Sequence, residues 1–102
     1  MIIVEIGKEN EEYAMSFFKD SMQHVRIMKI NKFSGSAELI QVCIMVSALT
    51  AGSIIRLVRD LNKKEQYMKI LGQGGELKPE EITEEYIKEH TDDCCEPVDE
   101  QE

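Results

Sequence analysis

The prediction of the fold depends most on residues 39–55, whose sequence is Leu-Ile-Gln-Val-Cys-Ile-Met-Val-Ser-Ala-Leu-Thr-Ala-Gly-Ser-Ile-Ile. This stretch carries no charged side chain, and no proline occurs between Ser36 and Lys63. We therefore expect one long helix that opens at Ser36-Ala37-Glu38 and runs to about Lys63, with Gly52 as its only interruption. Its segment over residues 39–55 would be roughly 25 Å long at about 1.5 Å per residue.

The two sides of this predicted helix differ in chemistry. At about 100° per residue, one broad arc is apolar, whereas a narrower strip carries small, polar and basic side chains. We predict this strip as an interaction surface made of Gln41, Met45, Ala48, Gly52, Arg56 and Arg59. Ala48 and Gly52 lie four residues apart, a spacing of small residues that lets a second backbone approach closely.

Three interpretations of the predicted helix stay open. It forms the core of a small sheet, it also supplies a seam for self-association into a homo-oligomer, or residues 39–55 span a membrane once. Strand patterns before and after the helix favour the first interpretation. A membrane span is not favoured, because roughly 25 Å is shorter than the ~30 Å thickness of the hydrocarbon layer.

The rest of the chain predicts strands and two shorter helices. Short β-branched or alternating runs indicate strands, and acidic starts followed by helical apolar spacing indicate helices. We expect strands over residues 2–6, 24–33, 66–71 and 76–77, and helices over residues 10–22 and from Pro79 to His90. The predicted fold is α+β, with a small sheet of three or four strands packed against the long central helix, in the order β-α-β-α-β-(β)-α.

Charge is unevenly distributed along the chain. The 102 residues have a formal net charge of -8, yet residues 1–75 hold 10 basic and 8 acidic side chains. Residues 76–102 hold 2 basic and 12 acidic side chains. We therefore predict a folded α+β core over residues 1–77, an acidic helix over residues 78–90 and a disordered acidic tail over residues 91–102.

This distribution bears on the partners. A strongly acidic total argues against sequence-independent nucleic-acid binding by the intact chain, because phosphates are neutralised by clustered Lys and Arg. The core nevertheless has basic residues that we predict as a surface for an acidic partner: Arg26, Lys29, Lys32, Lys63 and Lys64. We hypothesise that the acidic tail folds back and shields this surface; the alternative is that it serves only solubility.

No group of residues predicts catalysis, a cofactor or a metal site. Gly72-Gln73-Gly74-Gly75 lacks the residues of a phosphate-binding loop and is typical of a turn. Cys43 would need a base to act as a nucleophile, and His24 is the only histidine outside the acidic end, so we interpret Cys43 as a core residue. Cys94 and Cys95 are adjacent, which does not suit a tetrahedral metal centre, and we predict reactive thiols there.

The N-terminus and the cysteines bear on the compartment. The run Met1-Ile2-Ile3-Val4 has no basic start and is broken by Glu5, unlike a signal peptide. The three cysteines are an odd number, and Cys43 lies in the most apolar stretch. This usage does not suit a secreted disulfide framework, so we expect a cytoplasmic protein.

One family resemblance bears on the function. The patterning of residues 39–61, followed by Tyr67-Met68-Lys69-Ile70, is similar to that of the effector-associated constant components, small bacterial domains encoded beside effector proteins in conflict systems. The similarity extends over residues 1–77, although the chain lacks the tryptophan of that group near the end of the long helix. The resemblance implies a non-catalytic adaptor or regulator whose partner is an effector protein.

We therefore predict a non-enzymatic protein-interaction module, an adaptor or regulator of a bacterial or phage defence system that self-associates through its central helix or binds a protein partner. Two alternatives from other classes stay open. One is an acidic phage-type inhibitor that mimics nucleic acid. The other is a small single-pass membrane protein that spans the bilayer with residues 39–55. No cofactor is expected in any of these.

Overall fold

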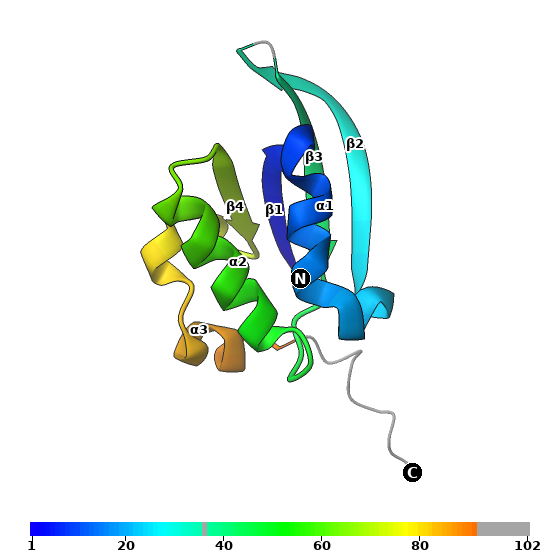
Figure 1. The fold of residues 1–102 in the computed structure, drawn as a ribbon. Coiled ribbons are helices and arrows are strands. Elements are labelled where there is room, and N and C mark those ends of the chain that lie inside the picture. The colour runs from blue at the N-terminus through cyan, green and yellow to red at the C-terminus, as the bar shows by residue number, and fades with distance from the viewer. Residues whose placement is uncertain (36, 92–102) are drawn as a thin grey trace.

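The computed structural model describes residues 1–35 and 37–91, which form an antiparallel sheet with helices against one of its faces (Figure 1). The strands are β1 (Ile2–Gly7), β2 (Val25–Ser34), β3 (Ala37–Ile44), β4 (Met68–Gly72) and β5 (Gly75–Leu77). The α-helices are α1 (Glu11–Met15), α2 (Ala51–Lys63) and α3 (Glu84–Glu89). Short 3-10 helices accompany them: η1 (Lys8–Asn10), η2 (Ser16–His24) and η3 (Pro79–Glu81).

The strand order is β2-β3-β1-β4-β5, so β3 and β1 lie inside the sheet. Val4 of β1 pairs with Val42 of β3 on one side and with Ile70 of β4 on the other, antiparallel in both cases. Each helical connection therefore skips one strand, which is the split βαβ arrangement. As a consequence, the α1–η2 segment and α2 lie side by side over one face of the sheet (Figure 1). We call the opposite side the outer face.

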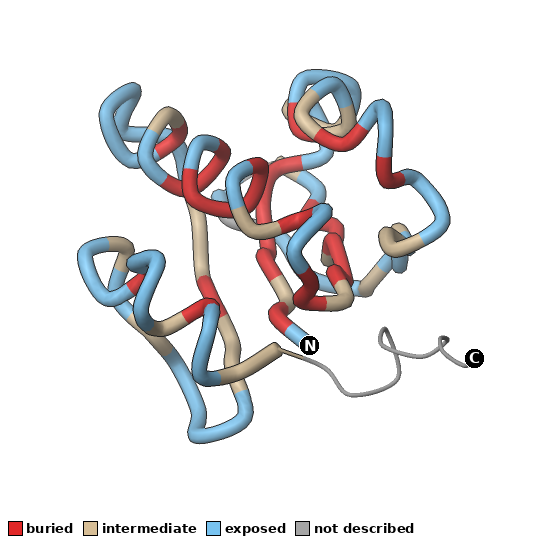
Figure 2. Tube along the Cα trace, turned by 90° about the horizontal axis from the view of Figure 1, so that it is seen from below, coloured by how far each residue is buried: buried red, intermediate tan, exposed pale blue. Residues whose placement is uncertain are grey.

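The hydrophobic core lies between the sheet and this helical layer. Val4 and Val42 are 0% exposed, and the apolar face of α2 packs against them with Ile54, Leu57, Val58 and Leu61. Figure 2 shows buried segments of helices and strands facing one another. The core continues past the predicted boundary at Leu77, because Ile82 and Ile87 are each 2% exposed and belong to the same cluster.

The predicted long central helix is wrong. Residues 37–44 form β3, and α2 begins only at Ala51, so the predicted element order β-α-β-α-β-(β)-α lacks this strand. The physical reason is that side chains on both sides of β3 are buried: Leu39, Ile40, Val42, Cys43 and Ile44. A strand buried on both faces is a continuous apolar run, and such a run has no periodicity that separates it from a buried helix.

Residues 45–50 form a turn that connects β3 with α2, and the side chains of Ser47 and Thr50 take part in it. The Thr50 hydroxyl donates to the Met45 carbonyl at 2.7 Å and accepts from the Ser47 N–H at 3.0 Å. The Ser47 carbonyl in turn accepts from the Ala51 N–H at 3.0 Å. Ser and Thr compete with regular backbone pairing in this way, which is why the apolar run does not continue as one element.

The C-terminal helices pack against α2 and reach the end of β4. Gly72 ends β4, and a side chain at this position would meet the Tyr86 hydroxyl oxygen of α3 at 2.6 Å. Glycine is therefore required by the close approach of α3 rather than by turn geometry. The predicted tail over residues 91–102 lies outside the described residues except for Thr91.

In residues 1–35 and 37–91, none of the helices combines the length and the apolar character needed to cross a bilayer. The segment predicted as an alternative membrane span, residues 39–55, consists of most of β3, the turn after it and the first residues of α2.

Candidate functional site

The predicted interaction strip does not form one surface. Its members occupy three elements: Gln41 in β3, Met45 and Ala48 in the turn, and Gly52, Arg56 and Arg59 in α2. The prediction of a single strip required residues 41–48 to be helical, and the structure shows that they are not. Gly52, Arg56 and Arg59 are exposed and stay together on the outer side of α2.

The predicted basic surface is divided in the same manner. Its members lie at two separate places: Arg26, Lys29 and Lys32 in β2, and Lys63 and Lys64 at the C-terminal end of α2. Arg26 pairs with Cys43 across the sheet, and Lys32 reaches the outer face, where its ammonium lies 3.8 Å from Glu5. Only α2 combines predicted basic residues with predicted interaction residues.

A continuous groove runs between η2 and α2. One hollow of about 460 Å³ is lined by residues of η2, by Leu49 and by the first half of α2. A second hollow of about 280 Å³ continues along α2 to Lys63, and Phe17 and Arg56 line both. We call this surface the basic groove and define it by Phe17, Lys19, Leu49, Arg56, Arg59 and Lys63.

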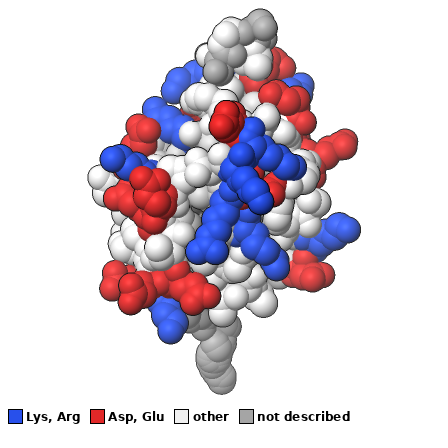
Figure 3. Space-filling view, turned by 60° about the vertical axis from the view of Figure 1, so that its left-hand side comes forward, with Lys and Arg blue, Asp and Glu red and all other residues white. Residues whose placement is uncertain are grey.

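Positive charge dominates the basic groove. Its four basic side chains are exposed, and they form no ion pair within residues 1–35 and 37–91. The groove also has two carboxylates, those of Asp20 and Asp60. Figure 3 brings forward the side of the molecule on which α2 lies, and it shows Lys and Arg side chains gathered in a band with Asp and Glu around it. The groove therefore offers four cations that form no close ion pair in the described part of the chain.

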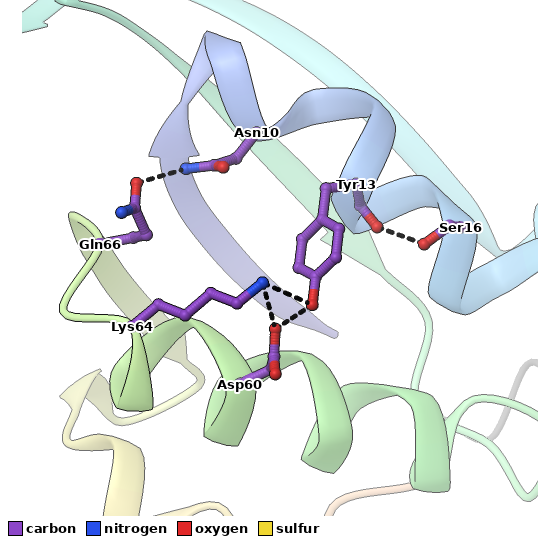
Figure 4. Close-up of polar contacts among 6 residues, drawn as sticks. All are labelled: Asn10, Tyr13, Ser16, Asp60, Lys64 and Gln66. Atoms are coloured by element: carbon purple, nitrogen blue, oxygen red, sulfur yellow. Dashed lines mark hydrogen bonds and ion pairs between the residues drawn. The ribbon is translucent and has the colours of Figure 1, made fainter.

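The negative charge of Asp60 is balanced by a hydrogen-bonded cluster that connects α1 with α2 on the two sides of the groove (Figure 4). The Tyr13 hydroxyl of α1 donates to Asp60 of α2, and the Lys64 ammonium lies 3.4 Å from the same carboxylate. Lys64 also donates to the Tyr13 hydroxyl at 3.1 Å and lies 4.1 Å from the centre of its ring. The hydrogen bond from Tyr13, aided by Lys64, holds the pKa of Asp60 below its usual value. This cluster fixes the position of α1–η2 relative to α2.

Two apolar side chains complete the basic groove. Leu49 is 61% exposed at one end, and Phe17 is half-buried beside Arg56. The Phe17 ring packs edge-on against Tyr13, with 5.4 Å between the ring centres. Aromatic residues and Arg are enriched at protein interfaces, where they supply most of the binding energy. Lys19, Phe17 and Leu49 were not among the predicted site residues, and only their tertiary position beside α2 identifies them.

The outer face of the sheet holds a buried carboxylate. Glu5 of β1 is 1% exposed, and it accepts hydrogen bonds from the Tyr67 hydroxyl at 2.7 Å and from the Gln41 amide at 3.2 Å. Burial raises the pKa of Glu5, but these hydrogen bonds and the charges of Lys32 and Lys69 outweigh it, so the pKa lies below its usual value. The hydrogen bond to Glu5 raises the pKa of Tyr67 to about 12. The carboxylate among the apolar residues of β1 is the sequence signal for this network.

Cys43 and His24 do come together, at a cavity of about 260 Å³ on the outer face. Burial raises the pKa of the Cys43 thiol although Arg26 opposes the effect, and a nucleophilic cysteine needs the reverse shift. Among the described residues, no three His, Cys, Asp or Glu side chains gather into a metal cluster. The predicted reactive thiols, Cys94 and Cys95, lie outside the described residues.

The chain matches no protein-family model, no curated protein and no solved structure. The resemblance to effector-associated constant components therefore stays a prediction.

Proposed function

We propose that this chain is a non-enzymatic protein-interaction module that binds an acidic segment of a partner protein in the basic groove. The observation that carries the proposal is a continuous hollow in which four exposed basic side chains surround Phe17 and Leu49. A carboxylate-rich peptide with one apolar side chain complements both features. Its carboxylates pair with the basic side chains, and its apolar side chain covers Phe17 or Leu49.

The two arginines are central to this proposal. Arg56 lines both hollows and Arg59 follows it by three residues, so the two guanidinium groups project from the same side of α2. A guanidinium binds a carboxylate through two parallel hydrogen bonds, which gives direction as well as attraction. The resemblance to effector-associated constant components supports an adaptor or regulator of a bacterial or phage defence system, with an effector protein as the partner.

The test is binding of a fluorescein-labelled peptide of alternating Glu and Leu residues, followed by fluorescence anisotropy. In the full chain, R56E/R59E should weaken binding at least about tenfold, which corresponds to about 1.4 kcal/mol. The matched control is K29E/K88E, which changes the net charge equally but alters exposed residues of β2 and α3 outside the groove. Equal weakening by both double variants would show attraction by net charge alone and overturn the proposal.

Two further peptides separate charge from apolar contact. A peptide with Gln in place of Glu should not bind, and one with Ser in place of Leu should bind more weakly than the parent. Binding should also weaken with salt, because the Debye length shortens from about 10 Å at 0.1 M to about 3 Å at 1 M. Failure of the parent peptide to bind the unaltered chain at low salt contradicts the proposed groove specificity.

The acidic end of the chain has the same chemistry as the proposed partner. We propose that residues 92–102, which contain six carboxylates, shield the basic groove by charge attraction. A chain that ends at Thr91 should then bind the acidic peptide more tightly at low salt, and the difference should vanish at high salt. Unchanged affinity at low salt would leave the tail with a role in solubility only.

A further inference from the structure

Five side chains with soft or borderline donor atoms line the cavity on the outer face. They are Met1, His24, Met28, Cys43 and Met45, which supply three thioethers, one thiol and one imidazole. The remaining lining residues are Ile3, Gln23, Val25 and Arg26. No carboxylate lines this cavity among the described residues. The donor set is therefore rich in sulfur and poor in oxygen.

Strand register explains why these side chains converge. Ile3 of β1 and Arg26 of β2 both pair with Cys43 of β3, so Cys43 lies at the middle of three strands. Side chains two positions apart on a strand share a face, which puts Met1 beside Ile3, Met28 beside Arg26, and Met45 beside Cys43. Diagonal neighbours on such a face are about 7–8 Å apart at the Cα, within reach of a long side chain.

His24 enters the cavity from the end of η2. The Met45 N–H donates to the His24 carbonyl at 2.8 Å, which holds this residue next to the end of β3. Its Nδ1 atom is inaccessible to solvent and has no hydrogen-bond partner in the part of the chain that the structure describes. A buried polar atom without a partner is costly, and a rotation of the imidazole ring that lets this nitrogen reach a ligand in the cavity would remove that cost.

We propose that this cavity binds Cu(I), with the Cys43 thiolate as the anionic ligand and methionine thioethers and His24 as the neutral ones. Thiolate and thioether ligands select Cu(I), and imidazole also suits copper. Hard cations such as Mg²⁺ and Ca²⁺ prefer carboxylate ligands, and no carboxylate among the described residues lines this cavity. The proposal is independent of the basic groove, which lies on the helical layer at the other side of the sheet.

The binding step is an exchange of a proton for the metal ion. The Cys43 S–H bond breaks, its proton goes to solvent, and a sulfur–copper bond forms, with copper in the +1 state before and after. The apolar surroundings disfavour a bare thiolate, but a metal ion at the sulfur replaces the proton. Arg26 pairs with Cys43 in the sheet, and its positive charge favours the anionic form of the thiol, although burial opposes this effect.

The test uses the full chain with C94S/C95S, because the two adjacent thiols would themselves bind soft metals. The probes are Ag(I), a soft monovalent ion without redox chemistry under these conditions, and Cu(I) under anaerobic conditions with a competing chelator. One equivalent of each should bind. C43A and M28L should each weaken binding about tenfold or more, since even changes next to a metal ligand cost that much. Zn(II) should bind far more weakly than Cu(I).

Methionine offers a matched control and a direct readout. The chain has six methionines, of which Met1, Met28 and Met45 line the cavity and the others do not. M22L is the control for M28L, because the two residues are 49% and 46% exposed and the exchange preserves volume. In carbon-13 methyl spectra, Ag(I) should shift the signals of Met1, Met28 and Met45 and leave those of Met15, Met22 and Met68 in place.

Each result decides the proposal. Absence of binding to the C94S/C95S chain would overturn it, as would affinities of the C43A and M28L variants that are unchanged from that of the C94S/C95S chain. Equal weakening by M22L and M28L would show non-specific methionine binding and would overturn it too. Circular dichroism of each variant confirms that the fold is kept, and M28L keeps the proposal testable if C43A fails to fold.

Discussion

The two faces of the sheet carry different kinds of side chain, although the same strands form both faces. Towards the helical layer, the buried residues of β1 and β3 are aliphatic, such as Ile6 and Val42, which are 0% exposed. Towards the outer face, the alternate positions hold Glu5, Gln41 and Cys43, each with a polar or ionisable group. The comparison teaches that stability comes mostly from the covered face, which leaves the outer face free to keep polar and sulfur-containing groups.

The largest expected effect concerns how far the covered face extends along the chain. A chain that ends at Leu77 lacks Ile82 and Ile87, which belong to the core cluster. Loss of one buried isoleucine side chain typically costs about 2–5 kcal/mol, so loss of both should cost at least about 4 kcal/mol. Since domains are stable by only about 5–15 kcal/mol, this loss removes a large part of the free energy of unfolding, and the melting temperature should fall well below that of the unaltered chain.

The matched control for that truncation is a chain that ends at Thr91. It removes none of the described core, so its free energy of unfolding should change by no more than about 0.5 kcal/mol. Thermal denaturation followed by circular dichroism measures both. Similar melting temperatures for the two truncated chains would show that the fold is complete at Leu77 and that η3 and α3 do not belong to the core.

The next largest effect compares two consecutive residues of β3 that face opposite sides. Ile44 is 0% exposed against the helical layer, and Cys43 is 7% exposed on the outer face. Ile44→Ala should destabilise the protein by about 2–5 kcal/mol, whereas Cys43→Ala should cost about 1 kcal/mol. Urea denaturation gives both values. If Cys43→Ala is as destabilising as Ile44→Ala, the outer face contributes equally to the core and the comparison fails.

How much of this fold is predictable from the sequence depends on which pattern each element shows. β1 and β4 overlap the strands expected over residues 2–6 and 66–71, because short β-branched runs with adjacent glycines are local signals. β3 has no such signal, because side chains on both of its sides are buried and its residues form one apolar run with the start of α2. The hydroxyls of Ser47 and Thr50 are the only local indication of the break.

The candidate sites follow the same rule. Arg56 and Arg59 are predictable, because they lie within a true helix whose polar side is evident from spacing. Phe17, Lys19 and Leu49 join them only through the packing of η2 and the turn against α2, which no local pattern encodes. The sulfur-lined cavity likewise needs the pairing of β2 with β3 and of β3 with β1, so it becomes visible only when β3 is recognised as a strand.

A smaller effect compares two tyrosines that each donate to a carboxylate. Tyr67 donates to Glu5, which is 1% exposed, whereas Tyr13 donates to Asp60 on the surface of α2. Tyr67→Phe should cost about 1–3 kcal/mol, because a buried acceptor loses a charged hydrogen bond. Tyr13→Phe should cost less than about 1 kcal/mol, because water replaces the lost donor. Equal losses in urea denaturation would mean that Glu5 is reached by water.

The smallest expected effect is the pH dependence of the pair formed by the buried Glu5 and the exposed Tyr67. The pKa of folded Glu5 lies below the usual 4.5, so its contribution to stability is complete above about pH 4.5 and is lost as the pH falls through the lowered pKa. The pKa of Tyr67 is raised from 10.0 to about 12, so the protonated hydroxyl stabilises the fold fully below pH 10, and this contribution is lost as the pH rises towards 12.

Tyr67→Phe isolates the alkaline part of this dependence. Lys64 has a pKa above its usual value through its hydrogen bond with Tyr13, so it also loses its contribution at high pH, but equally in both proteins. The difference in unfolding free energy between the unaltered chain and Tyr67→Phe should therefore stay constant from about pH 6 to pH 10 and shrink above it. If this difference in unfolding free energy does not shrink above pH 10, the ionisation of Tyr67 does not depend on Glu5. The two residues would then not be electrostatically coupled.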